Sequence, residues 1–444
     1  MTTGRRILYT FLILGFVAAA GALLLRHPVA PIPKLQARHG AMALGGEWLN
    51  TRNAVGGLQA RLRKNPDDHQ ARLLLAQAYI QEGRVTGNHP YYDAAALQLA
   101  DEVLAQEPEN FEALCTKAVI CLSQHHFSQG LAVAQKAADL NPANAFVQGL
   151  MCDAYVELGH YAEAVKAADR MNQLRPDLRA YARVSYLREI HGDLNGAREA
   201  MDMAVKAGVP GLEQTEWCRV VLGRLYENSG DLNRADEQYQ MAMATRPNYA
   251  YALAGLARTS LARGNYPAAI KQLTQARLLV RDYAFMEELT EAYRLNNEPR
   301  RAEQAARAVV NELAADANAA DENEALGHYS DRELAYAYLK TNELDKALQH
   351  AKIEYDRRPA NIDVCEAMAW VHYRRGEYKE AQQYMRQARR TGSQNPQLLY
   401  RAGCIALRSG QVAEGQALLQ QAKTLNPYLL TDPADQPLLL TAAR

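Results

Sequence analysis

The side chains best suited to chemistry in this chain are six cysteines and eleven histidines, and their spacing does not form a reactive site. There is no C-x-x-C pair, and the cysteines are too few and scattered for a disulfide framework. They are Cys115, Cys121, Cys152, Cys218, Cys365 and Cys404. His125 and His126 are adjacent, so their rings cannot converge on one metal from a helix face, and we expect a solvated turn there.

Four common catalytic and nucleotide-binding motifs are absent as well. H-E-x-x-H, G-x-S-x-G, the Walker A loop and G-x-G-x-x-G are all missing from the sequence. We therefore predict no catalytic residue, no metal and no cofactor, and we expect no small-molecule substrate. Fifty basic and fifty acidic residues cancel, so no excess positive field favours nucleic acid as a partner.

The composition is that of a folded body, with 48% hydrophobic and 23% charged residues. Tyrosines outnumber phenylalanines by 24 to 6. This ratio favours amphipathic helix surfaces over one deep central core.

An apolar segment lies near the N-terminus. Residues 7–25 carry no charge, and as a helix they would span about 28 Å, close to the hydrocarbon thickness of a bilayer. We predict a tail at 1–6, a transmembrane signal-anchor helix at 7–25 and a spacer at 26–50. The alternative is a cleaved signal peptide, because small residues at 18–22 could form a cleavage site. Three leucines at 23–25 prolong the apolar run past that site and favour a retained anchor.

The charges around this segment bear on its orientation. Arg5 and Arg6 favour an N-terminus inside the cell, although Arg26, Lys34 and Arg38 reduce the asymmetry. We expect a single-pass protein of the bacterial inner membrane with a periplasmic body. If the segment is cleaved, the protein would be soluble and periplasmic or secreted.

Beyond residue 50, prolines recur at a regular interval of about 34 residues. Pro108, Pro142 and Pro176 are evenly spaced at this interval, and Pro359 and Pro427 are separated by twice the interval. Pairs of small residues follow the same period, and they would let two antiparallel helices approach closely. The first members of the pairs are Ala76, Ala118, Cys152, Ser185, Gly223, Ala257, Thr290, Ala335, Ala369 and Gly403. The second members are Ala96, Gly130, Ala164, Ala197, Ala235, Ala269, Ala302, Ala347, Ala381 and Gly415.

Between the two members of most pairs stands a residue that accepts the left-handed backbone conformation ending a helix. These residues are Gly159, Gly192, Gly230, Gly264, Asn297, Asn342, Gly376 and Gly410. The period, the small pairs and the turn residues together predict a series of helical hairpins.

This pattern resembles the tetratricopeptide-repeat (TPR) family. Residues 223–247, GRLYENSGDLNRADEQYQMAMATRP, carry the family's small–x2–Tyr, Gly, small–x6–small and Pro signature. The resemblance covers about residues 50–427 and implies an all-α, right-handed superhelical solenoid of about ten units after the N-terminal transmembrane helix. The units are expected to start near His69, Phe111, Ala145, Leu178, Glu216, Ala250, Tyr283, His328, Ile362 and Pro396.

Three segments depart from the regular repeat. Residues 51–66 are expected to be a lone capping helix within a solenoid of 51–427, and 428–444 a C-terminal cap segment over the last repeat. An acidic, alanine-rich insertion at 314–325 could lengthen a helix, or it could be a mobile loop or hinge.

In TPR proteins the first helix of each pair lines a concave groove, so the resemblance also implies a binding surface for a protein or an extended peptide. The matching positions are Tyr186, Trp217, Arg224, Tyr251, Arg258, Tyr329, Arg332, Tyr336, Trp370, Tyr373, Arg374 and Tyr400. Tyr, Trp and Arg are the residues that anchor protein interfaces. Arg224 and Arg258 could grip a carboxylate, although such arginines also pair with nearby acids such as Glu227 or Glu291.

The same resemblance separates the cysteines into two groups. Cys121, Cys152 and Cys365 fall on buried repeat positions, whereas Cys115 and Cys404 are expected to face the groove.

These observations favour a non-enzymatic, membrane-anchored scaffold in bacterial envelope assembly. The alternative is a regulatory or adaptor subunit of a membrane enzyme or transporter complex. A third hypothesis, with less support, is that this protein is itself an enzyme.

Overall fold

The computed structural model describes residues 32, 34–36, 52–322 and 327–431, without the side chains of 319–322. The predicted tail, the anchor at 7–25, and most of the spacer and of the cap segment lie outside the described residues. The chain divides into two units after residue 36, and all the described helices belong to the second. None of the described helices is both long and apolar enough to cross a membrane.

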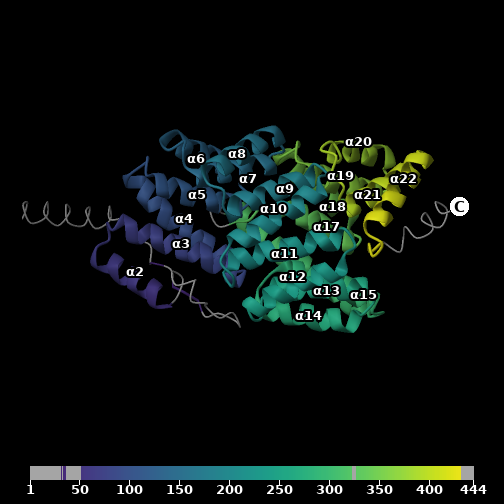
Figure 1. Cartoon of the computed structure of the whole chain (residues 1–444), viewed down its shortest axis with the longest axis horizontal. Helices are drawn as coiled ribbons and strands as arrows, with labels where there is room; N and C mark the ends of the chain where they lie inside the picture. Colours follow the sequence, from purple (N-terminus) through teal and green to yellow (C-terminus); the bar gives the residue numbers. More distant parts are fainter. Residues whose placement is uncertain (1–31, 33, 37–51, 323–326, 432–444) are drawn as a thin grey trace, which may run out of the picture. The chain divides into compact units, whose positions relative to one another are not determined.

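The described part of the chain is entirely helical, with 21 helices and no strand (Figure 1). A single helix, α2 (Arg52–Lys64), comes first, and ten hairpins follow it. The first five hairpins are α3 (His69–Thr86) with α4 (His89–Gln106), α5 (Phe111–Ser123) with α6 (Phe127–Leu140), α7 (Ala145–Glu157) with α8 (Tyr161–Leu174), α9 (Leu178–Ile190) with α10 (Leu194–Ala207), and α11 (Glu213–Asn228) with α12 (Leu232–Thr245). The other five are α13 (Ala250–Ala262) with α14 (Tyr266–Leu279), α15 (Tyr283–Leu295) with α16 (Pro299–Glu322), α17 (Asp331–Lys340) with α18 (Leu344–Arg357), α19 (Ile362–Arg374) with α20 (Tyr378–Ala388), and α21 (Pro396–Arg408) with α22 (Val412–Leu425).

The small residues pack where the helices of each hairpin cross. All twenty predicted positions are buried, and most of the alanines are completely inaccessible to solvent. A glycine at 223 brings its helix against the Tyr239 ring, because an added Cβ would lie 2.5 Å from Tyr239 Cε1. The period of small residues therefore predicts the hairpin architecture correctly.

Turn and capping residues fix where each helix begins and ends. Every predicted turn residue has a positive φ, including Asn297 (58°) and Asn342 (59°). The first helices often begin with an asparagine or aspartate cap two residues after a proline. The side chain of Asn144, for example, accepts hydrogen bonds from the N–H groups of Phe146 and Val147.

Eight of the ten first helices begin at the predicted residue. Helix α11 begins three residues early, at Glu213, and the Glu216 carboxylate in its first turn accepts a hydrogen bond from Gly211 N at 2.7 Å. Helix α17 begins three residues late, at Asp331, because the backbone of Tyr329 is held by contacts with a distant hairpin. The acidic insertion is helical as far as it is described, since α16 continues to Glu322.

The array of hairpins closes on itself after about six repeats. The tips of the first five hairpins, at residues 87, 125, 159, 192 and 230, contact the loops that precede α15, α17, α19, α21 and the segment after α22. We call this line of contacts the seam. Three of its hydrogen bonds join residues that are 199 or 204 positions apart in the chain, close to six periods of the repeat.

Backbone and side-chain groups both contribute to the seam. Arg281 N donates to Thr86 O at 3.2 Å, and Tyr329 N donates to Gln124 O at 3.2 Å. Ile362 N donates to the Tyr161 hydroxyl at 2.9 Å. Gln124, Tyr161 and Ile362 are buried, so their polar groups would lack partners without these hydrogen bonds, and the seam is a specific interface.

Further along the seam, asparagine side chains reach hairpin tips. Asn361 Nδ2 donates to Glu157 O at 3.0 Å, and Asn426 Nδ2 donates to Glu227 O at 3.2 Å. Both asparagine residues are buried. The seam therefore runs from the first hairpin to the last.

Two histidines in the seam make it sensitive to acid. The rings of His125 and His328 lie 4.0 Å apart, and burial lowers the pKa of His125 to about 4 and of His328 to about 3. In the unfolded chain both rings titrate near pH 6.5. Below that pH the unfolded state binds protons that the folded state does not, so stability is full above pH 6.5 and falls as the pH drops.

We expect the free energy of unfolding to fall by roughly 1–2 kcal/mol per histidine between pH 7 and pH 5. Urea unfolding at both pH values, compared with a His328→Gln variant, measures the contribution of that ring. The variant should lose less stability than the wild type over this interval. An equal loss in both proteins would contradict the assignment. Glu333, whose pKa is about 2, does not interfere, because its contribution is lost only below pH 4.5.

Candidate partner-binding surface

The first helices of the hairpins define the inner side of the array. Helix α3 contacts α5, α5 contacts α7, α7 contacts α9, and the same holds for α11 with α13, α17 with α19 and α19 with α21. Successive second helices do not approach one another as closely. The side that carries the first helices is therefore the concave one, as the repeat pattern implies.

Two aromatic side chains are exposed on this inner side. Tyr186 of α9 is 38% exposed and Trp217 of α11 is 44% exposed. Trp217 packs edge-on against Tyr251 of α13, with ring centroids 5.1 Å apart. Surrounding protein raises the pKa of Tyr186 well above its ordinary value, and the nearest acidic groups, Asp363 and Glu157, act in the same direction.

The predicted arginine pair is divided between two roles. Arg258 donates hydrogen bonds to Glu227 at 3.1 Å and to Glu288 at 3.0 Å. Burial opposes its charge, but these two carboxylates raise the pKa of Arg258 well above its usual range. Its guanidinium is therefore already occupied, as the alternative of pairing with Glu227 predicts. Arg224 is exposed and forms no ion pair with any described residue.

Several predicted residues in the C-terminal half are likewise engaged within the chain. Arg332 donates to Glu333 at 2.7 Å and lies 3.6 Å from Asp363. Tyr336 accepts a hydrogen bond from Arg401 at 3.0 Å. These contacts hold α17, α19 and α21 together on the inner side.

The remaining predicted aromatics are largely covered. Trp370 and Tyr373 stack at 4.7 Å and are each 6% exposed, and Tyr400 is 2% exposed. Tyr329 belongs to the seam, where Arg357 lies 3.8 Å from its ring centroid, and Arg374 is half-buried. Of the predicted residues, only Tyr186, Trp217 and Arg224 are exposed. We call these three, together with the half-buried Tyr251 that contacts Trp217, the inner aromatic patch.

Two expectations about histidine and cysteine are wrong. His125 and His126 do not form a solvated turn: His126 is buried, and His125 Nδ1 lies 2.8 Å from Tyr329 O in the seam. Cys115 and Cys404 do not face the groove, because both are buried in the helix packing.

The other cysteines are buried as well, including the three predicted to be so. Burial raises the pKa of Cys115, Cys152 and Cys218 to about 12, so these thiols stay protonated and unreactive at neutral pH. Within the described residues, no three metal-ligating side chains gather around one point.

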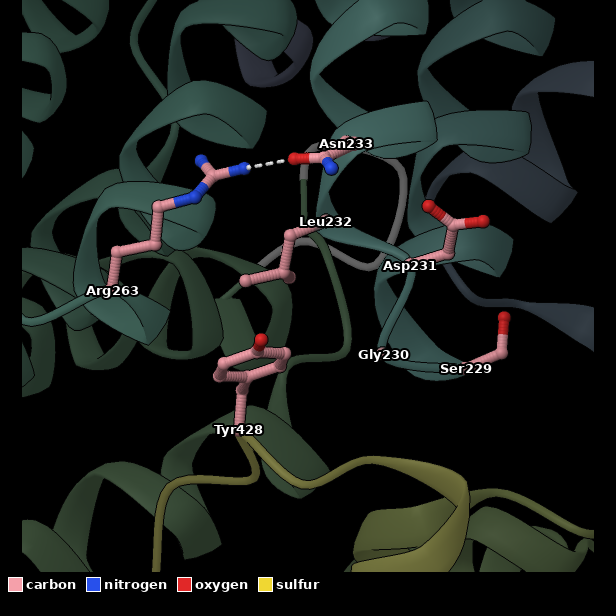
Figure 2. A pocket seen from close by; sticks show the side chains of 7 residues that line it. All are labelled: Ser229, Gly230, Asp231, Leu232, Asn233, Arg263 and Tyr428. Atoms are coloured by element: carbon pink, nitrogen blue, oxygen red, sulfur yellow. Dashed lines mark hydrogen bonds between the residues drawn. The ribbon is translucent and has the colours of Figure 1, made fainter.

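One cavity, of about 320 Å³, lies at the C-terminal end of the seam (Figure 2). It lies between the tip of the α11–α12 hairpin, Arg263 and the exposed ring of Tyr428. Its polar groups are engaged: Arg263 donates to Asn233 at 3.2 Å and to Asp236 at 2.6 Å. Asp231 accepts a hydrogen bond from Arg234 N, so this cavity offers few free polar groups to a ligand.

A second cavity, of about 220 Å³, lies at the opposite end of the seam. Residues around the tip of the first hairpin form one wall, and Tyr251, the loop before α15 and the end of α16 form the other. Tyr251 thus belongs both to this cavity and to the inner aromatic patch. The sequence could not indicate this cavity, because its two walls are brought together only by the seam.

Comparison with known proteins supports the same architecture. A tetratricopeptide-repeat family profile matches residues 50–96, 220–279 and 366–429. No curated protein matches the chain.

Several solved structures are similar to parts of the chain, each with a TM-score below 0.5. Cut9–Hcn1 of the APC/C is similar over 72% of this chain and 58% of that one, with 17% identity and a TM-score of 0.48. The chain thus spans less than two thirds of that structure. A tetratricopeptide repeat protein from Parabacteroides merdae is 16% identical over 54% of this chain and 91% of that one, with a TM-score of 0.42. Human IFIT1, in a dimer with PPP-AAAA, is 14% identical over 77% and 78% of the two chains, with a TM-score of 0.48.

The repeat of small residues, the ten described hairpins and the three profile matches agree with one another. The chain therefore contains tetratricopeptide repeats of this family.

Proposed function

We propose that this protein is a non-enzymatic scaffold that holds a protein or extended peptide segment against the inner aromatic patch. The observation that carries the proposal is Trp217, a large apolar side chain that is 44% exposed on the concave side. Burying this ring against a partner would remove apolar surface from water, and the indole N–H of Trp217 could still donate a hydrogen bond. Exposed Arg224 on the same helix adds a charged anchor.

Site-specific photo-crosslinking tests this surface. A benzophenone side chain at position 186 or 217 should give the same discrete protein adduct in cells. Position 278 is the matched control, because Leu278 is 72% exposed but lies on α14, a second helix. Equal labelling from all three positions, or labelling from position 278 alone, would contradict the proposal.

Substitution of the patch gives an independent measurement. Replacing Trp217, Arg224 and Tyr251 together with alanine should abolish capture of the crosslinked partner, because the main anchors are removed. Circular dichroism should show unchanged helicity, since Trp217 and Arg224 are exposed. Full capture by the triple variant would place the binding surface elsewhere.

We further propose that residues 7–25 tether this scaffold to the bacterial inner membrane, with the helical body in the periplasm, for a role in envelope assembly. Support comes from the apolar length of that segment and the two arginines before it. In fractionated cells the intact protein should be found with the membranes. Protease added to spheroplasts should digest its helical body. Protection from protease would reverse the orientation, and release into the soluble fraction would favour cleavage.

A further inference from the structure

The cavity of about 220 Å³ beside the inner aromatic patch has a definite chemical character. Its aromatic walls are Tyr251 and Tyr283, and four carboxylates line it, from Asp93, Glu312, Asp282 and Asp316. The volume exceeds that of one long side chain. The cavity is therefore large enough to take a side chain from a bound partner.

Two of the four carboxylates have a basic side chain within ion-pair distance. Arg281 lies 3.0 Å from Glu312, and His89 lies 3.4 Å from Asp93, which also accepts a 2.6 Å hydrogen bond from Ser123. Arg281 and His89 both line the cavity, and each has one of these carboxylates as its ionic partner.

Asp282 and Asp316 have no ion-pair partner among the described residues. Asp282 caps α15 by accepting from Ala284 N at 2.9 Å, and it also accepts a hydrogen bond from the Tyr251 hydroxyl. Burial raises the pKa of both carboxyl groups, although His89 acts in the opposite direction on Asp282 and Arg281 does so on Asp316. A cation in the cavity they line would reduce this cost.

The position of the cavity indicates where such a cation would come from. Tyr251 forms part of its wall and also contacts Trp217, the exposed ring of the inner aromatic patch. A peptide lying on Trp217 could therefore direct a neighbouring side chain past Tyr251 into the cavity. Lysine or arginine suits it best, because tyrosine rings and carboxylates both attract such cations.

We propose that this cavity binds a lysine or arginine side chain of the peptide segment held on the inner aromatic patch. This inference rests on the proposed scaffold function and adds a specificity: the partner is basic at the residue that enters the cavity. Asp282 and Asp316 supply the charge, and Tyr251 and Tyr283 supply the walls.

Binding of synthetic peptides tests the specificity. The probe is a fluorescent peptide of alternating leucine and arginine, and its counterpart carries citrulline, which has nearly the same shape without the charge. By fluorescence anisotropy we expect the arginine peptide to bind the protein at least tenfold more tightly. Equal affinity of the two peptides would overturn the proposal.

Variants assign that preference to the cavity. Asp282→Asn and Asp316→Asn should each weaken the arginine peptide about tenfold and leave the citrulline peptide unchanged. Asparagine keeps the capping ability of position 282, so the fold should be retained, which thermal melting checks. Asp345→Asn is the control, because its carboxylate is 95% exposed and pairs with Arg375 on the surface. Equal effects of Asp345→Asn and the cavity variants would reduce the preference to general surface charge and overturn the proposal.

Two further outcomes separate the possibilities. Agmatine, a small free guanidinium compound, should compete only weakly. Competition by agmatine as strong as that of the peptide, and unaffected by Trp217→Ala, would assign the cavity to free small cations and overturn the peptide assignment. If position 217 gives the crosslinked partner but the arginine and citrulline peptides bind equally well, this inference is wrong and the proposed scaffold function is retained.

Discussion

Replacing Arg358 with alanine is expected to lower the free energy of unfolding by about 3–5 kcal/mol, a larger loss than at any exposed ion pair of this protein. Arg358 is 3% exposed and pairs with Glu354 of α18 and, across the seam, with Glu157 of α7. Its guanidinium also lies 4.6 Å from the centroid of the Phe127 ring. Without it, Glu354, which is 3% exposed, would be left as a buried charge without its closest partner.

Chemical denaturation measures this effect, and a surface arginine provides the control. Arg375 also bridges two acids, Asp345 and Glu377, but Asp345 is almost fully exposed. Arg375→Ala should therefore cost less than about 1 kcal/mol. Similar losses in the two variants would mean that the seam contributes little to stability.

Replacing Gly159 with alanine should have the second largest effect. Gly159 has a φ of 78°, and an added Cβ would lie 2.0 Å from Ala360 O and 2.2 Å from Ala360 C across the seam. These are backbone atoms, so the two segments must move apart. We expect a loss of about 1–3 kcal/mol from this clash, in addition to the strain of a side chain at positive φ.

Gly264 separates the clash from the strain. It occupies the same place in its own hairpin, with a φ of 77°, but an added Cβ there would meet nothing within 4 Å. Gly264→Ala should therefore show only the strain, about 1–2 kcal/mol. The difference between the two melting curves measures the close approach at the seam. Coincident curves would show that the seam is not closed at Gly159.

The local architecture could be predicted from sequence because each hairpin is specified within its own repeat. Ala269 and Ala257 pack at the crossing of their two helices, and Gly264 lies between them in the sequence. The residues that determine a hairpin therefore all lie within one repeat. The same holds for caps such as Asn144. For that reason eight helix starts agree to the residue.

The seam could not be predicted, because it depends on small rotations that add up over six repeats. Insertions between repeats change that sum, and nothing in the types of His125 or Gly159 indicates a partner in so distant a repeat. His125 in particular has the hydrophilic character of an exposed turn, yet it meets His328. The handedness of the coil stays a prediction.

The inner surface lies between these cases. The family pattern identifies which helices face inward, but it does not say which inward side chains are already engaged. Arg224 and Arg258 occupy equivalent positions 34 residues apart, and only Arg258 pairs with acids on the two neighbouring first helices, Glu227 and Glu288. Pairing of this kind depends on three successive repeats, which single-repeat positions do not describe.

Closure of the array on itself changes how the molecule should fold and unfold. In an open array of repeats, each unit touches only its neighbours, and unfolding can start at either end and spread by one unit at a time. Here the first hairpin is held by the loop before α15, and Asn426, after the last helix, is held by the fifth hairpin. Neither end can fray alone, so the body should melt as one cooperative block, and its assembly should be slowed by the need to join distant parts of the chain.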